Sequence, residues 1–192
     1  LFGREVGAEP IFTLPSCFSY VDGEGNKIYY ANGSAETLMG QWRAENGHTQ
    51  PYDVKWWCIG NEMYGPWQLG HMALNQYVIK HNLFAKAMRD VDPDIKLIGV
   101  GAVGNWSRGM LTHCTETTDL LSEHFYRQEK DSVVENVQQI PKAVRQIADA
   151  HREYRQTLDT LEGKDIRIAL DEWNYWYGEH VYGELGTRYF MK

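Results

Sequence analysis

Short apolar runs alternate with longer amphipathic stretches along this chain, and this alternation constrains the fold more than any other feature. Runs such as VKWWCI and IKLIGV lack the polar alternation of a half-exposed strand, which is typical of strands buried in a parallel sheet. Strands that alternate with helical segments indicate β-α units. The five predicted strands cover residues 8–12, 54–59, 95–100, 120–126 and 166–170.

Helical patterns lie between these strands. We predict helices over residues 34–43, with Ser34 as N-cap, over residues 74–90, and over much of residues 133–161. Residues 21–30 contain two glycines and predict an irregular loop. A closed β/α barrel needs eight strands, typically in about 250 residues. The fold class that we expect is therefore α/β, a single incomplete (β/α) barrel domain spanning residues 1–192.

Aromatic residues are unusually frequent, with seven Trp and twelve Tyr among 192 residues. Aromatic faces stack on sugar rings, so this content favours a carbohydrate partner. A large aromatic core is the alternative explanation, and composition leaves both open.

Charge and hydropathy exclude other partners. The net charge is −7 and no basic run exceeds two residues, which argues against nucleic acid. No apolar stretch approaches the roughly 20 residues that span a bilayer, so we expect no membrane association. The first residues lack an initiating Met and a signal-peptide pattern, so we expect a piece of a longer protein. Cytoplasmic and secreted locations both stay open.

The cysteines and histidines do not form a metal-binding pattern. Cys17, Cys58 and Cys114 are odd in number and widely spaced, which argues against a disulfide framework or a zinc site. Cys58 lies in an apolar run and is expected in the core. The seven histidines are scattered. We therefore predict no metal and no cofactor.

The first candidate for chemistry is Asn61-Glu62, directly after the strand at residues 54–59. Ligands bind at the C-terminal ends of strands in β/α folds. Apolar neighbours such as Tyr64 and Trp67 would raise the pKa of Glu62, as a general acid requires. In the alternative interpretation, Asn61 caps the next helix and Glu62 lies in its first turn. The aromatic context favours a site.

The second candidate is Asp171-Glu172, at the end of the strand at residues 166–170 and followed by Trp173 and Trp176. Side chains alternate along a strand, so only one of the two acids is expected to face a pocket. A single strand-end acid is more often just solvated. Two strand-end glutamates among aromatic residues favour a shared site.

Retaining glycosidases use such a pair of carboxyl groups, about 5–5.5 Å apart. Glu62 and Glu172 are our candidate catalytic residues, and Asn61 could bond the sugar hydroxyl beside the reacting carbon. At the end of the fourth predicted strand, residues 120–126, His124 or Tyr126 could orient a catalytic carboxylate.

Alternatives weaken some of these assignments. A partly buried structural histidine is an equally good interpretation of His124. Trp67 and Trp176 are candidate sugar platforms, although either could simply contribute to packing.

Several motifs together resemble glycoside hydrolase family 51, the α-L-arabinofuranosidases, over about residues 8–177. They are residues 43–48 (RAENGH), 52–57 (YDVKWW), 60–62 (GNE), 65, 67–71 (WQLGH), 84–88 (FAKAM), 92–93 (DP), 122–126 (SEHFY) and 171–174 (DEWN). The resemblance implies a (β/α)8 barrel followed by a β-sandwich. It further implies the following roles: Glu62 as acid/base, Glu172 as nucleophile, Asn61 as arabinose contact, Tyr126 as support of the nucleophile, and His124 and Trp176 as subsite lining.

The five predicted strands look like the third to seventh of the family's barrel, and no pattern for the sandwich is visible. Open sheet edges are a liability, so we expect either a truncated piece or a homo-oligomer that covers them. The expected substrate is a plant cell-wall arabinoxylan or arabinan oligosaccharide. The alternatives are a non-catalytic carbohydrate-binding module derived from such a barrel, and another retaining hydrolase acting on xylan or glucan.

Overall fold

A single parallel sheet organises the chain, whose computed structural model describes residues 2–14 and 21–176. Neighbouring strands are consecutive in sequence and all pair in parallel. This confirms the predicted five-stranded partial barrel. The strands are β1 (Ile11–Leu14), β2 (Trp56–Ile59), β3 (Lys96–Val100), β4 (Leu120–Arg127) and β5 (Arg167–Tyr175).

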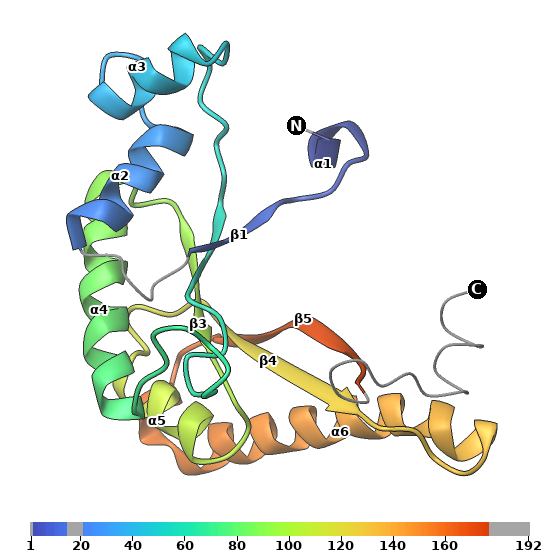
Figure 1. The fold of residues 1–192 in the computed structure, drawn as a ribbon. Helices are drawn as coiled ribbons and strands as arrows, with labels where there is room; N and C mark the ends of the chain where they lie inside the picture. Colours follow the sequence, from blue (N-terminus) through green and yellow to red (C-terminus); the bar gives the residue numbers. More distant parts are fainter. Residues whose placement is uncertain (1, 15–20, 177–192) are drawn as a thin grey trace.

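Helices cover one face of this sheet. In Figure 1 the helices from α2 to α6 lie along the left and the bottom of the view, outside the curved strands. Among the described residues, no helix is long and apolar enough to cross a membrane. The helices are α1 (Phe2–Glu5), α2 (Val21–Asn32), α3 (Leu38–Glu45), α4 (Leu74–Val91), α5 (Asn105–His113), α6 (Val133–Thr157) and the 3-10 turn η1 (Asp159–Leu161).

The loop predicted for residues 21–30 is wrong, because these residues form most of helix α2. Glycine costs about 1 kcal/mol in a helix, which is why the sequence pattern favoured a loop. Ile28 and Ala31 are buried against the rest of the core, and this burial offsets the cost. A Cβ at Gly25 would lie 3.5 Å from Val91 of α4, an ordinary packing distance, so α2 lies directly against α4 at this position.

Other helices and strands begin at different residues from those predicted. Helix α3 begins after Thr37, not Ser34, because the Thr37 hydroxyl accepts the hydrogen bond from the Gly40 N–H. Strand β1 lies later than residues 8–12, since Pro10 has no N–H to donate to a ladder. Helix α5 has no counterpart among the predicted helices.

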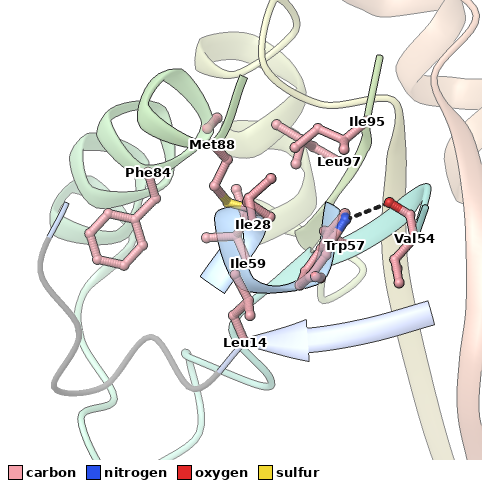
Figure 2. Packing of buried hydrophobic residues seen from close by; sticks show 11 residues of the cluster. Leu14, Ile28, Val54, Trp57, Ile59, Phe84, Met88, Ile95 and Leu97 are labelled. Carbon is pink, nitrogen blue, oxygen red and sulfur yellow. Dashed lines mark hydrogen bonds between the residues drawn. The ribbon is translucent and has the colours of Figure 1, made fainter. Parts of the chain in front are cut away.

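The main core lies between the sheet and helices α2 and α4. Figure 2 shows Trp57 and Ile59 of β2 within this cluster, together with Phe84 and Met88 of α4. The Trp57 indole N–H donates to the Val54 carbonyl at 3.0 Å, which satisfies the buried donor (Figure 2). The outward side chains of β2 thereby anchor the strand that leads to Glu62.

The opposite face of the sheet carries a smaller apolar layer. Cys58 contacts Ile98 and Ala169 there, with Trp56 and Leu120 beside them. Cys58 is buried, as expected, and so is Cys114; both are free thiols. Cys17 lies outside the described residues. Above this layer, the C-terminal ends of β2, β4 and β5 present polar side chains.

Candidate active site

Glu62 lies in a tight turn just beyond β2. Its φ is 44°, in the left-handed region, and Gly60 before it has φ 87°. The Gly65 N–H donates to the Glu62 carbonyl at 2.7 Å and closes the turn. A non-glycine residue in this conformation is strained, a feature often found at functional sites. The helix-cap alternative is wrong, because the next helix, α4, begins after Ala73.

Two side chains donate to the carboxylate of Glu62 and a third contacts it; the residue is only 8% exposed. The Trp67 indole N–H lies 2.5 Å from Oε2, and the Tyr64 hydroxyl lies 3.3 Å from Oε1. His124 Nδ1 lies 3.0 Å from the same Oε1. A Cβ on Gly65 would come within 2.3 Å of the Trp67 ring, so a glycine is required for this ring position.

Glu172 lies on β5 and is held from β4. The Tyr126 hydroxyl donates to Glu172 Oε1 at 2.5 Å. His124 Nδ1 lies 3.6 Å from Oε2. The Glu172 side chain remains 38% exposed, more than that of Glu62, so it is open to an incoming ligand.

A β-bulge changes the expected alternation on β5. Ser122 of β4 pairs with Ala169 of β5, and His124 of β4 pairs with Glu172 of β5. The step is two residues on β4 but three residues on β5. The extra residue on β5 re-aims the side chains that follow. Both Asp171 and Glu172 therefore lie within 3.6 Å of His124, whereas the expectation that only one of them faces the pocket stays a prediction.

His124 lies at the centre of the polar cluster, with its side chain 6% exposed. Burial alone would lower its pKa, but hydrogen bonds and charges from Asp171, Glu62 and Glu172 raise the pKa to about 9. This raised pKa favours the protonated ring at neutral pH.

The pKa of Glu62 is lowered rather than raised. Burial raises it, but the combined hydrogen bonds from His124, Trp67 and Tyr64 and the charge of His124 outweigh burial. The sequence-based expectation of a raised pKa is therefore wrong, because the aromatic neighbours supply donors as well as apolar surface.

The cluster also has the spacing of a cation site. His124 and one oxygen each of Glu62 and Glu172 present atoms within 4.8 Å of one another. The protonated imidazole itself supplies positive charge between the two acids. The absence of a metal stays a prediction.

A cavity of about 570 Å³ is lined by Glu62, Trp67, Tyr126 and Trp176, and Glu172 contacts one of these residues, Tyr126. This volume lies in the range of small-molecule sites. Trp67 and Trp176 are 67% and 55% exposed, so both offer ring faces to a ligand. Asn61 is half-buried and precedes Glu62, but it is not among the described residues that line this cavity.

Two residues of this cluster, Ser122 and Asp171, were not among the site residues predicted from the sequence. The Ser122 hydroxyl donates to Asp171 Oδ1 at 2.8 Å, and both atoms approach His124 Nε2. The spacing could have indicated Ser122, because it lies two residues before His124 and residues two apart on a strand face the same side. Nothing in the sequence marks the bulge that brings in Asp171.

Parallel strands with outer helices, and a pocket of one acid and three aromatic residues at the strand ends, define part of a β/α barrel with a candidate ligand site in its usual place. Residues 3–157 match the family model described as the alpha-L-arabinofuranosidase 1 domain. The chain belongs to this family, the α-L-arabinofuranosidases of glycoside hydrolase family 51. Asp171 and Glu172 follow the matched residues.

Individual relatives agree with this assignment. The chain is 33% identical over 168 residues to an intracellular exo-alpha-(1->5)-L-arabinofuranosidase 1 of Bacillus subtilis, covering 82% of this chain and 33% of the relative. It resembles the solved α-L-arabinofuranosidase of Thermotoga maritima with a TM-score of 0.84 and 35% identity, covering 92% of this chain and 36% of that one.

A family 51 structure from Thermotoga petrophila gives the same TM-score and identity, with 92% of this chain and 37% of that one covered. The chain thus spans about a third of the length of the relatives that it matches.

Proposed function

We propose that this chain carries the catalytic pair of a retaining α-L-arabinofuranosidase, with Glu62 as general acid/base and Glu172 as nucleophile. The observation that carries the proposal is their proximity: one carboxyl oxygen of each lies within 4.8 Å of the other. Carboxyl groups about 5–5.5 Å apart suit retention, whereas inversion needs about 6.5–9.5 Å to admit a water molecule. The spacing therefore supports a double displacement.

In the first step, Glu172 attacks the anomeric carbon while Glu62 protonates the departing glycosidic oxygen. The Tyr126 hydroxyl donates to Glu172 and His124 lies beside it, and these contacts hold the carboxylate in place for attack. In the second step, Glu62 takes a proton from water, which attacks the glycosyl ester and releases Glu172. Asn61 is proposed to bond the sugar hydroxyl next to the reacting carbon.

The proposed substrate is a terminal α-L-arabinofuranosyl group on an arabinan or arabinoxylan oligosaccharide. The B. subtilis relative is named as an exo-acting (1->5)-arabinofuranosidase, which supports attack at chain ends. The two exposed indoles of Trp67 and Trp176 flank the cavity, and we propose that they stack on the sugar or its leaving group.

Hydrolysis of an aryl α-L-arabinofuranoside tests this function. We expect the chain to release the phenol, and Glu172→Ala to lower the rate of release by at least about 10³-fold. The control is Glu162→Gln, a change at an exposed acid that does not line the cavity, and its rate should be unchanged. Added azide should attack the vacated face in Glu172→Ala and give an arabinosyl azide of inverted configuration. Wild-type product of inverted configuration would contradict the proposal.

The binding-module alternative gives a different pattern. It predicts no turnover, together with polysaccharide binding that survives Glu172→Ala and is lost in Trp67→Ala or Trp176→Ala. That pattern would replace catalysis with binding as the function of this cavity.

A further inference from the structure

Both ring nitrogens of His124 face hydrogen-bond acceptors, and this arrangement determines where protons lie in the site. The inference drawn from it rests on the proposed roles of Glu62 and Glu172. The His124 side chain is 6% exposed, so water does not replace the protein partners of the ring.

On the Nε2 side, the partners are Ser122 Oγ at 3.0 Å and Asp171 Oδ1 at 3.1 Å. The Ser122 hydroxyl donates its own proton to Asp171 Oδ1 at 2.8 Å, which leaves its lone pairs free to accept. A carboxylate oxygen also accepts. Nε2 must therefore carry a hydrogen to bond with either partner.

On the Nδ1 side, the partners are Glu62 Oε1 at 3.0 Å and Glu172 Oε2 at 3.6 Å. Both are carboxyl oxygens, so the bond to Glu62 needs one proton, held either by the ring or by the acid. Other donors to these acids come from Tyr64, Trp67 and Tyr126, and none of them is a carboxylic acid or an ammonium.

We propose that Asp171, supported by Ser122, is a positioning residue that fixes a proton on His124 Nε2, so that Nδ1 stores the proton which Glu62 later donates. Asp171 touches neither the sugar nor the reacting bond; it acts through the ring, as the buried aspartate of a catalytic triad acts through its histidine. The lowered pKa of Glu62 in the free site is consistent with this storage, because the acid need not hold the proton itself.

The proton balance is as follows. Before attack, Nδ1 holds the proton and both glutamates are ionised. The Nδ1–H bond breaks as Glu62 gains the proton, and Glu62 passes it to the glycosidic oxygen, which leaves with the electron pair of the broken C–O bond. His124 is then neutral, with Nε2–H still bound to Asp171. In deglycosylation, water loses a proton to Glu62, and that proton returns to Nδ1.

The charged and titratable groups that face His124 are Glu62 beyond β2, and Asp171 and Glu172 on β5. The phenols of Tyr64 and Tyr126 contact two of these acids. Of the three acids, only Asp171 takes no part in the proposed bond-making steps. Replacing it therefore changes the protonation of the His124 ring without removing a catalytic carboxylate.

Nuclear magnetic resonance of the full chain labelled with ¹⁵N-histidine tests the proposal. Loss of signals in His124→Gln assigns the ring. In the wild type we expect both nitrogens to be protonated at about pH 7 and to titrate near a pKa of about 9. In Asp171→Asn we expect the titration to fall by about two pH units or more, towards the ordinary value of about 6.5. A wild-type ring that is neutral at about pH 7 would overturn the proposal.

Asp131→Asn makes the same change of charge on an exposed turn and should leave the titration unchanged. Ser122→Ala provides a second variant if Asp171→Asn does not fold, as judged by circular dichroism. It should lower the His124 titration by a smaller amount in the same direction. An unchanged titration in the folded Asp171 variant, or in Ser122→Ala where that variant alone folds, would refute the positioning role.

Kinetics separate this inference from the proposed function. Where the chain hydrolyses an aryl arabinofuranoside, Asp171→Asn should lower kcat by about 10²-fold with little change in KM, and should move the basic limb of the pH profile to lower pH. A wild-type chain without turnover would refute the proposed function, while the resonance titration would still decide whether Asp171 fixes the ring proton.

Discussion

At the scale of single residues, the site depends on how His124 shares its surroundings with three acids. Strand-end glutamates among aromatic residues were visible in the sequence, because a buried apolar run followed by an acid is a recognisable pattern. The donors to Glu62 were not visible, since hydrogen bonds from Trp67 and Tyr64 depend on the left-handed turn at Glu62. The two carboxylates do lie close together, and their catalytic roles stay a prediction. The direction predicted for the pKa of Glu62 was wrong.

The raised pKa of His124 predicts a pH-dependent stability. Its pKa is about 9 in the folded chain and about 6.5 when unfolded, so the folded state binds the proton more tightly. The stabilisation is complete below about pH 6.5 and is lost as the pH rises through about 9, with an upper limit of about 3 kcal/mol. Urea unfolding at about pH 6.5 and about pH 9.5 measures it. His124→Gln should reduce this difference but not abolish it, because the buried thiols of Cys58 and Cys114 also have raised pKa values and lower the stability at the higher pH. An equal difference in the variant would contradict the assignment.

The Trp67 indole N–H should help to set the pKa of Glu62. Trp67→Phe keeps an aromatic ring but removes the donor to Oε2, so the pKa of Glu62 should rise. Gly65→Ala should act in the same direction, because its Cβ would displace the ring. The carboxyl ¹³C titration of Glu62 measures the shift. The exposed Trp42→Phe is the matched control, and a Glu62 titration equal to the wild type in both test variants would disprove the assignment.

At the scale of elements, the sheet was more predictable than the helices. Parallel strands have short apolar runs, so all five strands were found in order, although the edge strand β1 is mostly exposed and begins later than predicted. Helix α2 was missed because burial of Ile28 and close packing against α4 offset its glycines, and a sequence pattern contains neither effect. The bulge on β5 was missed for a related reason: it depends on the pairing between two strands rather than on the residues of one.

A second buried polar cluster connects β4 to helices α5 and α6. Glu123 Oε1 accepts from Ser107 at 2.6 Å and lies 2.8 Å from His151 Nε2, while its Oε2 has no hydrogen-bond partner among the described atoms. His151→Ala should lower the free energy of unfolding by about 1–3 kcal/mol, because it removes a partner of a fully buried acid.

Denaturant unfolding measures this loss. The control is Arg152→Ala, the next residue on α6, whose ion pair with Asp149 is exposed and should contribute less than about 1 kcal/mol. Equal losses in the two variants would argue against a stabilising role of the buried cluster.

At the scale of the whole molecule, the described chain is a sheet with two unpaired edges, β1 and β5. Beside β1, an apolar cavity of about 470 Å³ includes Phe12 and Trp42, which are 46% and 57% exposed. Exposed edges and apolar patches promote association. The homo-oligomer expected from the sequence stays a prediction. The surface that we expect it to use is the β1 edge with the apolar cavity beside it.

Light scattering over a range of concentrations tests this association. We expect the chain to self-associate and Phe12→Lys to weaken the association by at least about tenfold, since edge lysines oppose strand pairing. Ile79→Lys, on an exposed position of α4, is the matched control. A wild-type monomer at all concentrations would contradict the prediction.

The position of the proton-holding groups along the chain has a consequence for recombination between relatives. The hydrogen bonds described for Glu62, His124 and Asp171 all come from residues 62–171. In a longer protein, segments that close the barrel would add cavity-lining residues and sugar contacts around Glu62, His124 and Asp171, whose mutual hydrogen bonds do not depend on those segments. A chimaera that joins this chain to closing strands of different relatives should therefore keep one pH profile while its preference among glycans changes.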